Sequence, residues 1–323
     1  MYRHIGIYLL LLLALPCSLV GQDINHSWRE VSTIAFMNTE NLYDTADSPF
    51  EGDEDYTPEG AKSWSEERYQ AKLRSVARVL DDMAADIVGL AEVENEKVMR
   101  DLVMTMSEDY NYIHRTTSDN RGIDIALLYR GDRFTPELVT QLSTSSSREV
   151  LYVRGTLSGE RIDLLVWHAP SQINDFDARL EAMQGLYGFA DSLRHSSRSA
   201  RVVVMGDMNA TPGDEVIRRT FGRRNRYGES DKGWLMPIDD VGSYAFEGNW
   251  YLYDNIFLDA DAFSGDTEIE GGVFARNYLI DRGVLSDERR EGYPWRTFSG
   301  DNYLGGTSDH LPVFINIRSG KLH

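Results

Sequence analysis

The chain has 323 residues, with 33 Lys and Arg against 52 Asp and Glu, so its formal net charge is −19. Its 41% hydrophobic and 26% charged residues exclude a collagen-like or largely disordered chain, and its single cysteine excludes an internal disulfide or a thiolate zinc cage. The acidic surplus argues against a protein that coats nucleic acid, because neutralising phosphates needs surplus Lys and Arg; an enzyme that meets phosphates through a bound cation stays open.

The N-terminus has the pattern of a secretory signal peptide. After a basic start, residues 5–16 form an apolar run that is shorter than the roughly 20 residues of a membrane span. We expect residues 1–21 to be a signal peptide, residues 22–30 to be a lead-in, and the protein to be exported, either periplasmic or extracellular. A lipid anchor on Cys17 is the alternative, which the bulky neighbour Pro16 disfavours.

The first half of the chain is predicted to contain short buried strands and two amphipathic helices. The acidic segment 47–60 contains two prolines and indicates a loop. Residues Ser63 to Glu66 have the capping-box pattern of a helix start. Apolar residues then follow at helical spacing on one face, namely Tyr69, Leu73, Val76, Leu80 and Met83. A second helix is predicted over 98–106, and strands are predicted over 34–37, 87–91 and 125–129.

The second half is predicted to be richer in strands. Strands over 161–167 and 201–205 flank a helix with apolar residues from Phe176 to Leu193, and late strands are expected over 250–258 and 313–317. Because some strands follow one another without a helix between them, the pattern favours an α/β protein with mixed sheets. No break in composition divides residues 31–319, so we expect one domain there, without stable membrane insertion.

Polar residues stand directly beside apolar runs at five places. These are Asn38 after 34–37, Glu92 after 87–91, His168 after 164–167, Asp207 with Asn209 after 202–206, and Asp309 with His310 before 311–314. In α/β proteins the strand ends at one sheet edge form the crevice in which ligands bind. Whether the fold brings these five junctions together is open at this point.

The chemistry that these residues suggest is metal-assisted hydrolysis. Glu92, Asp309 and the amide oxygen of Asn38 are hard oxygen ligands, which suit Mg²⁺, Mn²⁺ or Ca²⁺ rather than zinc. His168 and His310 could act as acid, base or phosphate hydrogen-bond donor. Taken singly, each residue also has a plain structural interpretation, such as a solvated glutamate, a core histidine or a turn.

The order of these motifs resembles the endonuclease/exonuclease/phosphatase superfamily. Residues 206–210 (GDMNA) look like its G-D-x-N motif, and residues 308–313 (SDHLPV) look like its terminal S-D-H-x-P-V motif. Glu92 looks like the glutamate of the family's Q-E-V, although Ala91 replaces the usual Gln. Further similar segments are WHAPS at 167–171, YDNI at 253–256 and, like an exported bacterial branch, NTENLYD at 38–44.

This resemblance implies a fold and a set of metal ligands. The fold would be an α/β four-layer sandwich of two facing mixed β-sheets flanked by helices. Glu92 would hold the divalent cation, expected to be Mg²⁺ with Mn²⁺ or Ca²⁺ as alternatives. Asn38 would help to hold the cation, and Asp309 would do so either directly or through a water molecule.

The resemblance also implies catalytic roles. His310 would face the scissile phosphate, oriented by Asp254, and His168 would donate to phosphate oxygens. Asp207 and Asn209 would position or deprotonate the attacking water, with Asp207 and His310 sharing the role of base. Asp124 is expected either to be the carboxylate partner of His168 or to pair structurally with Arg121.

Several phosphoester substrates remain open, because the superfamily cleaves DNA, RNA, inositol phosphates and sphingomyelin. We expect a phosphodiesterase or nuclease that acts as a monomer, with a phosphomonoesterase on a small metabolite as the alternative. A catalytically dead binding module is disfavoured because every motif residue is present. One basic cluster could track a nucleic-acid backbone or simply be solvated: Arg218, Arg219, Arg223, Arg224 and Arg226.

Overall fold

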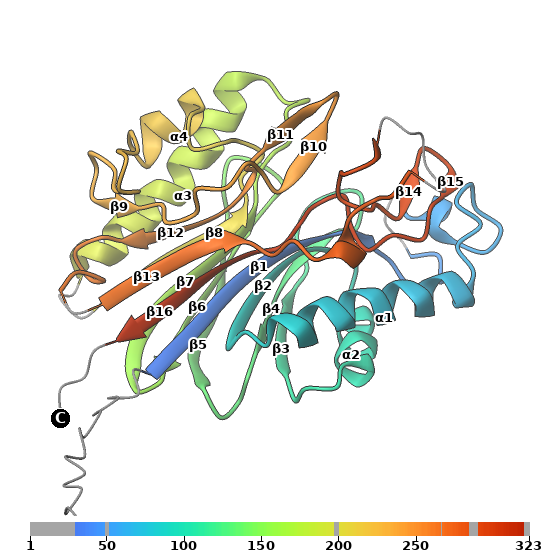
Figure 1. The fold of residues 1–323 in the computed structure, drawn as a ribbon, viewed down its shortest axis with the longest axis horizontal. Helices are drawn as coiled ribbons and strands as arrows, with labels where there is room; N and C mark the ends of the chain where they lie inside the picture. Colours follow the sequence, from blue (N-terminus) through green and yellow to red (C-terminus); the bar gives the residue numbers. More distant parts are fainter. Residues whose placement is uncertain (1–29, 49–51, 197–199, 266, 284–289, 320–323) are drawn as a thin grey trace, which may run out of the picture.

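The fold is described from a computed structural model (Figure 1). The structure describes residues 30–48, 52–196, 200–265, 267–283 and 290–319. The expected signal peptide, and the lead-in except for Glu30, lie outside the described residues. Within the described part of the chain, no helix has the length and apolarity needed to cross a membrane.

Two six-stranded mixed sheets form the centre of the molecule. The first consists of β1 (Glu30–Leu42), β2 (Ile87–Val93), β3 (Asn111–Arg115), β4 (Asp124–Tyr129), β13 (Thr267–Val273) and β16 (Val313–Ser319), in the order β13-β16-β1-β2-β4-β3. The second consists of β5 (Phe134–Leu142), β6 (Val150–Leu157), β7 (Glu160–His168), β8 (Val202–Asp207), β9 (Trp234–Leu235) and β12 (Asp254–Asp259), in the order β5-β6-β7-β8-β12-β9. Parallel pairing joins β1 to β2 and β7 to β8, while the other pairs are antiparallel.

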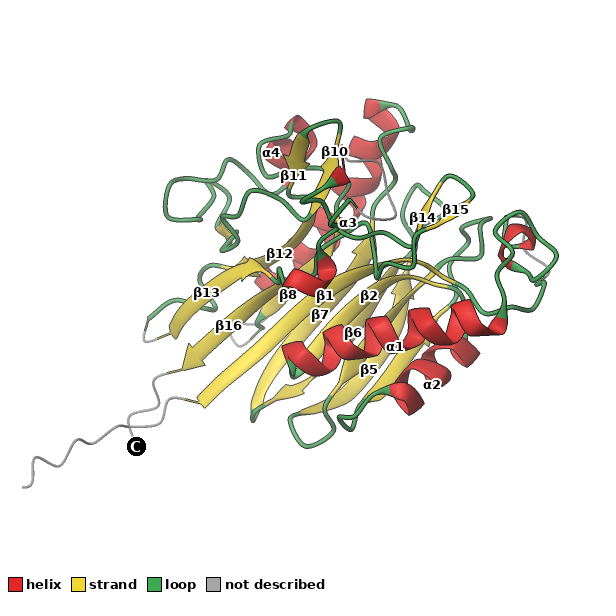
Figure 2. Ribbon diagram, turned by 45° about the vertical axis from the view of Figure 1, so that its right-hand side comes forward, coloured by secondary structure: helices red, strands yellow, loops and turns green. Residues whose placement is uncertain are grey.

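Helices cover the outer faces of both sheets. The first sheet carries α1 (Glu66–Met83) and α2 (Glu96–Thr105), which lie together on one side of the molecule (Figure 2). The second sheet carries α3 (Phe176–Ser196) and α4 (Glu215–Thr220), on the opposite side (Figure 1). This helix–sheet–sheet–helix arrangement confirms the expected four-layer α/β sandwich.

The alternation of side chains along each strand builds the core in layers. On β1, Ile34 and Phe36 pack into the core between the two sheets, whereas Ala35 and Met37 pack beneath α1 and α2. Residues of β7 divide in the same way between the inner core and the layer under α3. Each central strand therefore has apolar side chains on both faces, which explains its unbroken apolar run in the sequence.

The start of α1 differs from the expectation. The N-cap is Ser65 rather than Ser63, and its side chain accepts a hydrogen bond from the backbone N–H of Arg68. Ser63 instead has a positive φ of 45° and belongs to the turn before the helix. The expected apolar face of α1 is correct, because four of its five members are buried and Met83 packs against the same core.

The expected strand over 250–258 is two separate elements. Residues 249–251 pair with Tyr244–Phe246 as the hairpin β10 (Tyr244–Phe246) and β11 (Asn249–Tyr251), while β12 belongs to the second sheet. The hairpin turns at Glu247 and Gly248, which both have positive φ, as tight hairpins require. The remaining elements are η1 (Glu54–Tyr56), η2 (Asn277–Leu279), β14 (Phe298–Ser299) and β15 (Asn302–Tyr303).

The topology brings the polar junctions to one edge of the sandwich. β1 and β2 end there in the first sheet, and the parallel pair β7 and β8 ends there in the second, with His168 beside Asp207 in register. Asp254 lies opposite Asp207 where the antiparallel strand β12 begins. A hydrogen bond from Asn38 Nδ2 to Asp207 Oδ2, 3.1 Å long, joins the two sheets at this edge.

A test of this packing is Gly206→Ala. A Cβ at Gly206 would overlap the carbonyl oxygen of Trp167 on the neighbouring strand, and backbone cannot move aside as a side chain can. We expect a loss of at least about 1–3 kcal/mol in unfolding free energy, measured by chemical denaturation. The control is Gly185→Ala in α3, where a Cβ meets nothing within 4 Å and should stabilise by roughly 0.5–1 kcal/mol. Equal effects of the two variants would contradict this account.

Candidate active site

A cavity of about 780 Å³ opens at the edge where the polar junctions meet. Six of the nine expected site residues line it: Glu92, His168, Asp207, Asn209, Asp309 and His310. Asn38 and Asp254 are buried beside these residues, at 2% and 0% exposure, and reach the site through hydrogen bonds to Asp207 and His310. The structure therefore brings eight of the nine residues together.

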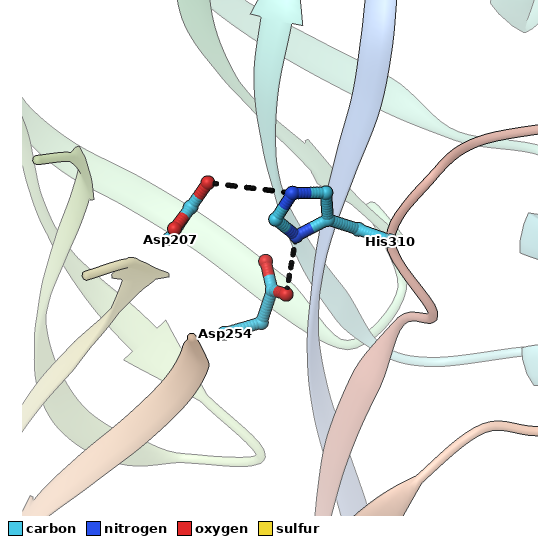
Figure 3. A group of neighbouring side chains, drawn as sticks. All are labelled: Asp207, Asp254 and His310. Carbon is cyan, nitrogen blue, oxygen red and sulfur yellow. Dashed lines mark hydrogen bonds and ion pairs between the residues drawn. The ribbon is translucent and has the colours of Figure 1, made fainter. Parts of the chain in front are cut away.

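His310 lies between two buried carboxylates, one on each side of its ring (Figure 3). Its Nδ1 is 2.7 Å from Asp254 Oδ2, and its Nε2 is 3.8 Å from Asp207 Oδ2. Burial alone would lower the pKa of His310, but Asp254 and Asp207 outweigh it and raise the pKa well above its ordinary value. We call this arrangement the Asp254–His310–Asp207 relay.

Asp207 is held by two further hydrogen bonds. Its Oδ1 accepts the backbone N–H of Asn209 at 2.9 Å, and its Oδ2 accepts Nδ2 of Asn38. Burial raises the pKa of the Asp207 carboxyl, although the positive charge of His310 opposes this. Asn209 has a positive φ of 45°, and its side chain donates to the carbonyl of Ala169, so it fixes the turn after β8.

Glu92 and His168 form the other side of the site. Glu92 lies at a register shift of β2 with a φ of 62°, and Asn41 N–H donates to its Oε2 at 2.9 Å. His168 Nε2 is 3.7 Å from both Glu92 Oε1 and Asp207 Oδ2. Burial, with Arg148 and Arg121 adding to it, holds the pKa of His168 well below its ordinary value. We therefore expect the two histidines to differ in charge near neutral pH.

Asp309 is supported by a buried network that sequence analysis missed. Its carboxylate pairs with Arg296, which also lies 3.8 Å from Glu40. Burial would raise the pKa of Asp309, but His310 and Arg296 outweigh it and lower the pKa. Glu40 accepts the N–H of Thr297 at 2.7 Å, so the network ties β1 to the loop that carries Asp309.

Lys72 completes this network from α1. Its ammonium is buried and donates to the carbonyls of Glu40 and Thr307 and to the hydroxyl of Thr297. Burial lowers the pKa of Lys72 to about 8 and raises that of Glu40 to about 7. A lysine among the apolar positions of an amphipathic helix was the available signal in the sequence, because a buried lysine needs partners.

The expectation for Asp124 is wrong. Its Oδ2 lies 2.9 Å from His114 Nε2 on the neighbouring strand, and its Oδ1 accepts the N–H of Thr117. Its partner is thus neither His168 nor Arg121, which pairs with Asp119. The antiparallel pairing of β3 with β4 places His114 opposite Ala126, two residues from Asp124, and so brings the two side chains together. The order of motifs in the sequence cannot predict this contact.

Two walls of the cavity were also missed. One carries Arg121 and Arg148, and the other carries Tyr244, Tyr251 and Tyr253. Tyr253 stacks between the other two tyrosines, with ring centroids 5.5 and 5.2 Å apart. The aromatic density of 244–253 was a signal for this wall. The expected basic cluster lies on α4 and the following loop, and none of its arginines is among the residues that line the cavity.

Comparison with known proteins identifies the family. The model of the endonuclease/exonuclease/phosphatase family matches residues 33–319. The chain belongs to this family. Its members hydrolyse phosphoesters, as the motif order implied. No curated protein matches the chain.

Solved structures of the family share the fold at low sequence identity. A humanised D. rerio TDP2 is 14% identical, with a TM-score of 0.58 over 90% of this chain and 99% of that one. A mannosyl-6-phosphatase from Bacteroides thetaiotaomicron is 16% identical, with a TM-score of 0.58 over 88% and 99%. Another family protein from B. thetaiotaomicron is 14% identical, with a TM-score of 0.59 over 91% and 97%.

The site residues fit a hard divalent cation. Glu92 and Asp309 line one cavity and offer carboxylate oxygens, the ligands that Mg²⁺, Mn²⁺ and Ca²⁺ prefer. Asn38 Oδ1 accepts the N–H of Glu40 and keeps one lone pair free for a ligand. Ligand atoms of Asp207, Asp254 and His310 also lie within 4.8 Å of one another, but His310 Nδ1 is already bonded to Asp254. That trio therefore suits proton transfer better than cation binding.

The opposite pKa shifts of the two histidines can be tested in the metal-free protein. At pH 7 we expect the ring of His310 to be protonated and that of His168 to be neutral, as measured by imidazole ¹⁵N chemical shifts. Asp254→Asn should lower the pKa of His310, because it removes a charge that stabilises the imidazolium. Titration of both rings near the ordinary histidine value would contradict the assignment.

Proposed function

We propose that this protein is a divalent-metal-dependent phosphodiesterase of the nuclease type. The observation that carries the proposal is the meeting of the Asp254–His310–Asp207 relay with Glu92 and Asp309 at one cavity. One side of this site offers oxygen ligands for a cation, and the other offers groups that move protons. Metal-assisted hydrolysis of a phosphoester needs both.

The residues divide the chemistry according to their charge. Asp207 is suited to accept a proton from the attacking water, because burial raises the pKa of its carboxyl. His310, kept protonated by Asp254, would donate to the phosphate or to the leaving oxygen. Neutral His168 would donate a hydrogen bond to a phosphate oxygen. A bound cation would neutralise charge on the phosphate oxygens.

The tyrosine wall favours a diester with a planar group. Tyr244 also packs against His310, with ring centroids 4.9 Å apart, so the wall reaches the reacting centre. Ile173 and Phe246, both exposed, add apolar surface to the lining of the same cavity. Nucleobases stack on such side chains, and a D. rerio TDP2 of this fold is described in complex with a single-strand DNA product.

A phosphomonoesterase on a small metabolite is the second candidate. It is favoured by the mannosyl-6-phosphatase of the same fold and by the two arginines at the cavity, which suit a doubly charged phosphate. Stacked tyrosines beside His310 fit a sugar phosphate less well than an aryl or nucleotide group. We therefore place it second.

Metal dependence and substrate class can be tested together. Bis-p-nitrophenyl phosphate, p-nitrophenyl phosphate, single-stranded DNA, plasmid and RNA are assayed with a chelator and with Mg²⁺, Mn²⁺ or Ca²⁺. We expect diester cleavage that stops in the chelator and returns with Mg²⁺ or Mn²⁺. Preferential cleavage of the monoester would favour the phosphomonoesterase function. Full activity in excess chelator would refute the metal requirement.

A matched pair of variants tests the proposed ligand. Glu92→Gln should raise the Mg²⁺ concentration needed for half-maximal rate by about tenfold or more, because a carboxylate binds Mg²⁺ far better than an amide. Glu96→Gln, an exposed glutamate on α2, is the control. An unchanged Mg²⁺ requirement in Glu92→Gln would remove this residue from the ligand set.

The relay predicts coupled losses of rate. His310→Ala should reduce the rate on a diester by about 10²–10⁴-fold, the range of a positioned acid–base group. Asp254→Asn should reduce it less, and the double variant should be little worse than His310→Ala, because residues that act as a unit are not additive. Circular dichroism checks folding. If the two single losses multiply in the double variant, the relay does not act as a unit.

A further inference from the structure

A second cavity, of about 330 Å³, adjoins the catalytic one. The two cavities share Arg121 and Arg148 in their linings. The second cavity is otherwise lined mainly by short polar side chains, including Asn120, Asn174 and Ser145 to Ser147. None of the residues of the Asp254–His310–Asp207 relay lines it, so it lies to one side of the reacting centre.

Asp119 holds both arginines in place. Its Oδ1 is 3.4 Å from Arg121 Nε, and its Oδ2 is 3.1 Å from Arg148 Nε. Because Asp119 contacts each guanidinium at Nε, the terminal nitrogens are left for other partners. Asp119 is the one carboxylate among the residues that line this cavity, because Glu92, which also acts on both arginines, lines the catalytic cavity instead. The lining of the second cavity thus carries two positive charges and one negative charge, although the chain carries a net charge of −19.

Arg148 offers a donor that the described residues leave without a partner. Its side chain is only 12% exposed, and its Nη1 is buried with no hydrogen bond. An unsatisfied buried donor of a charged group is costly, so its persistence in a folded protein calls for an explanation. Arg148 also lines the cavity, so a small shift of its side chain would bring this nitrogen to an anion bound between the two arginines.

The loops that carry the arginines are fastened to each other. Arg121 lies between β3 and β4 of the first sheet, and Arg148 lies between β5 and β6 of the second. Ser118 donates through its N–H and its hydroxyl to Glu149, at 2.8 and 2.6 Å, beside the Asp119–Arg148 pair. The hydroxyl of Tyr43 donates to the carbonyl of Arg121. The two guanidinium groups are thus positioned before any ligand arrives.

We propose that Arg121 and Arg148 form a second anion subsite, which binds another phosphate of the same substrate beside the scissile one. The planar guanidinium group of an arginine can donate two parallel hydrogen bonds to two oxygens of one phosphate. This inference rests on the proposed phosphodiesterase function and specifies its substrate class. The substrate is a phosphodiester with a further phosphate close to the scissile one. That further phosphate is either a terminal phosphate on a nucleic-acid end or the neighbouring linkage within a nucleic-acid strand.

The test compares substrates that share one scissile bond. Thymidylyl-thymidine and its 5′- and 3′-phosphorylated forms are cleaved with saturating Mg²⁺. We expect kcat/KM to be about tenfold higher for one phosphorylated form, mainly through KM, because the additional contacts hold a group remote from the chemistry. The ratio of kcat/KM with the additional phosphate to kcat/KM without it should fall toward one in Arg121→Met and in Arg148→Met. Arg121→Lys should keep part of this preference.

Arg130→Met is the matched control. Arg130 pairs with Glu108 and Asp132 and lines neither cavity, so its loss should leave the ratio unchanged. A wild-type protein that cleaves the dinucleotide with and without the additional phosphate equally well would overturn the subsite and leave the proposed function standing. An unchanged ratio in both arginine variants would overturn it as well.

A binding measurement keeps the two proposals separable. Inorganic phosphate is titrated into the metal-free protein while the Nε–H signals of Arg121 and Arg148 are followed by NMR. We expect saturable shifts of both signals, and in each methionine variant the shift of the remaining arginine's signal should be lost or much weakened. If phosphate binds but no diester is cleaved, the subsite stands and the proposed function fails. Absence of any shift overturns the subsite whatever the catalytic result.

Discussion

The hydrogen bond between His310 and Asp254 is the interaction on which the site depends. It joins the two sheets at their common edge, because Asp254 begins β12 and His310 lies just before β16. Asp254 is fully buried, and a buried carboxylate without a counter-charge is strongly destabilising. The imidazolium supplies that charge and is itself stabilised by it. The proton that the proposed chemistry needs is therefore part of what stabilises this edge.

A second buried pair holds the loop that delivers His310. Lys72 and Glu40 connect α1 and β1 to the segment 296–309, at the level where Arg296 pairs with Asp309. The buried ammonium of Lys72 has few alternative acceptors within reach. Its hydrogen bonds therefore fix the segment 296–309, which contains little regular structure. The positions of Asp309, the candidate metal ligand, and of His310 are thus set from the first sheet and its helix.

Local patterns predicted an α/β protein with mixed sheets, and the resemblance to the family supplied the four-layer sandwich. Of the nine predicted site residues, eight meet at the edge, because the motifs that carry them are local in the sequence. Apolar runs of central strands are unbroken, and the motifs stand directly beside them. Asp124 was given the wrong partner because its contact with His114 depends on the register in which β3 pairs with β4, which the sequence does not show. Edge strands such as β5 and β13 were missed because half-exposed strands mix polar and apolar residues. Arg148 lies in a loop whose position depends on the contact between the sheets.

The distribution of charge explains how so acidic a chain can receive phosphates. Charges beyond roughly 8 Å are largely screened at physiological salt, so the net charge matters less than the groups around the cavity. There, Glu92 and Asp309 offer oxygen ligands for a cation, and Arg121 and Arg148 supply fixed positive charge near His168. The net charge of −19 still acts against non-specific binding of polyanions, so recognition of a phosphate has to come from these local groups.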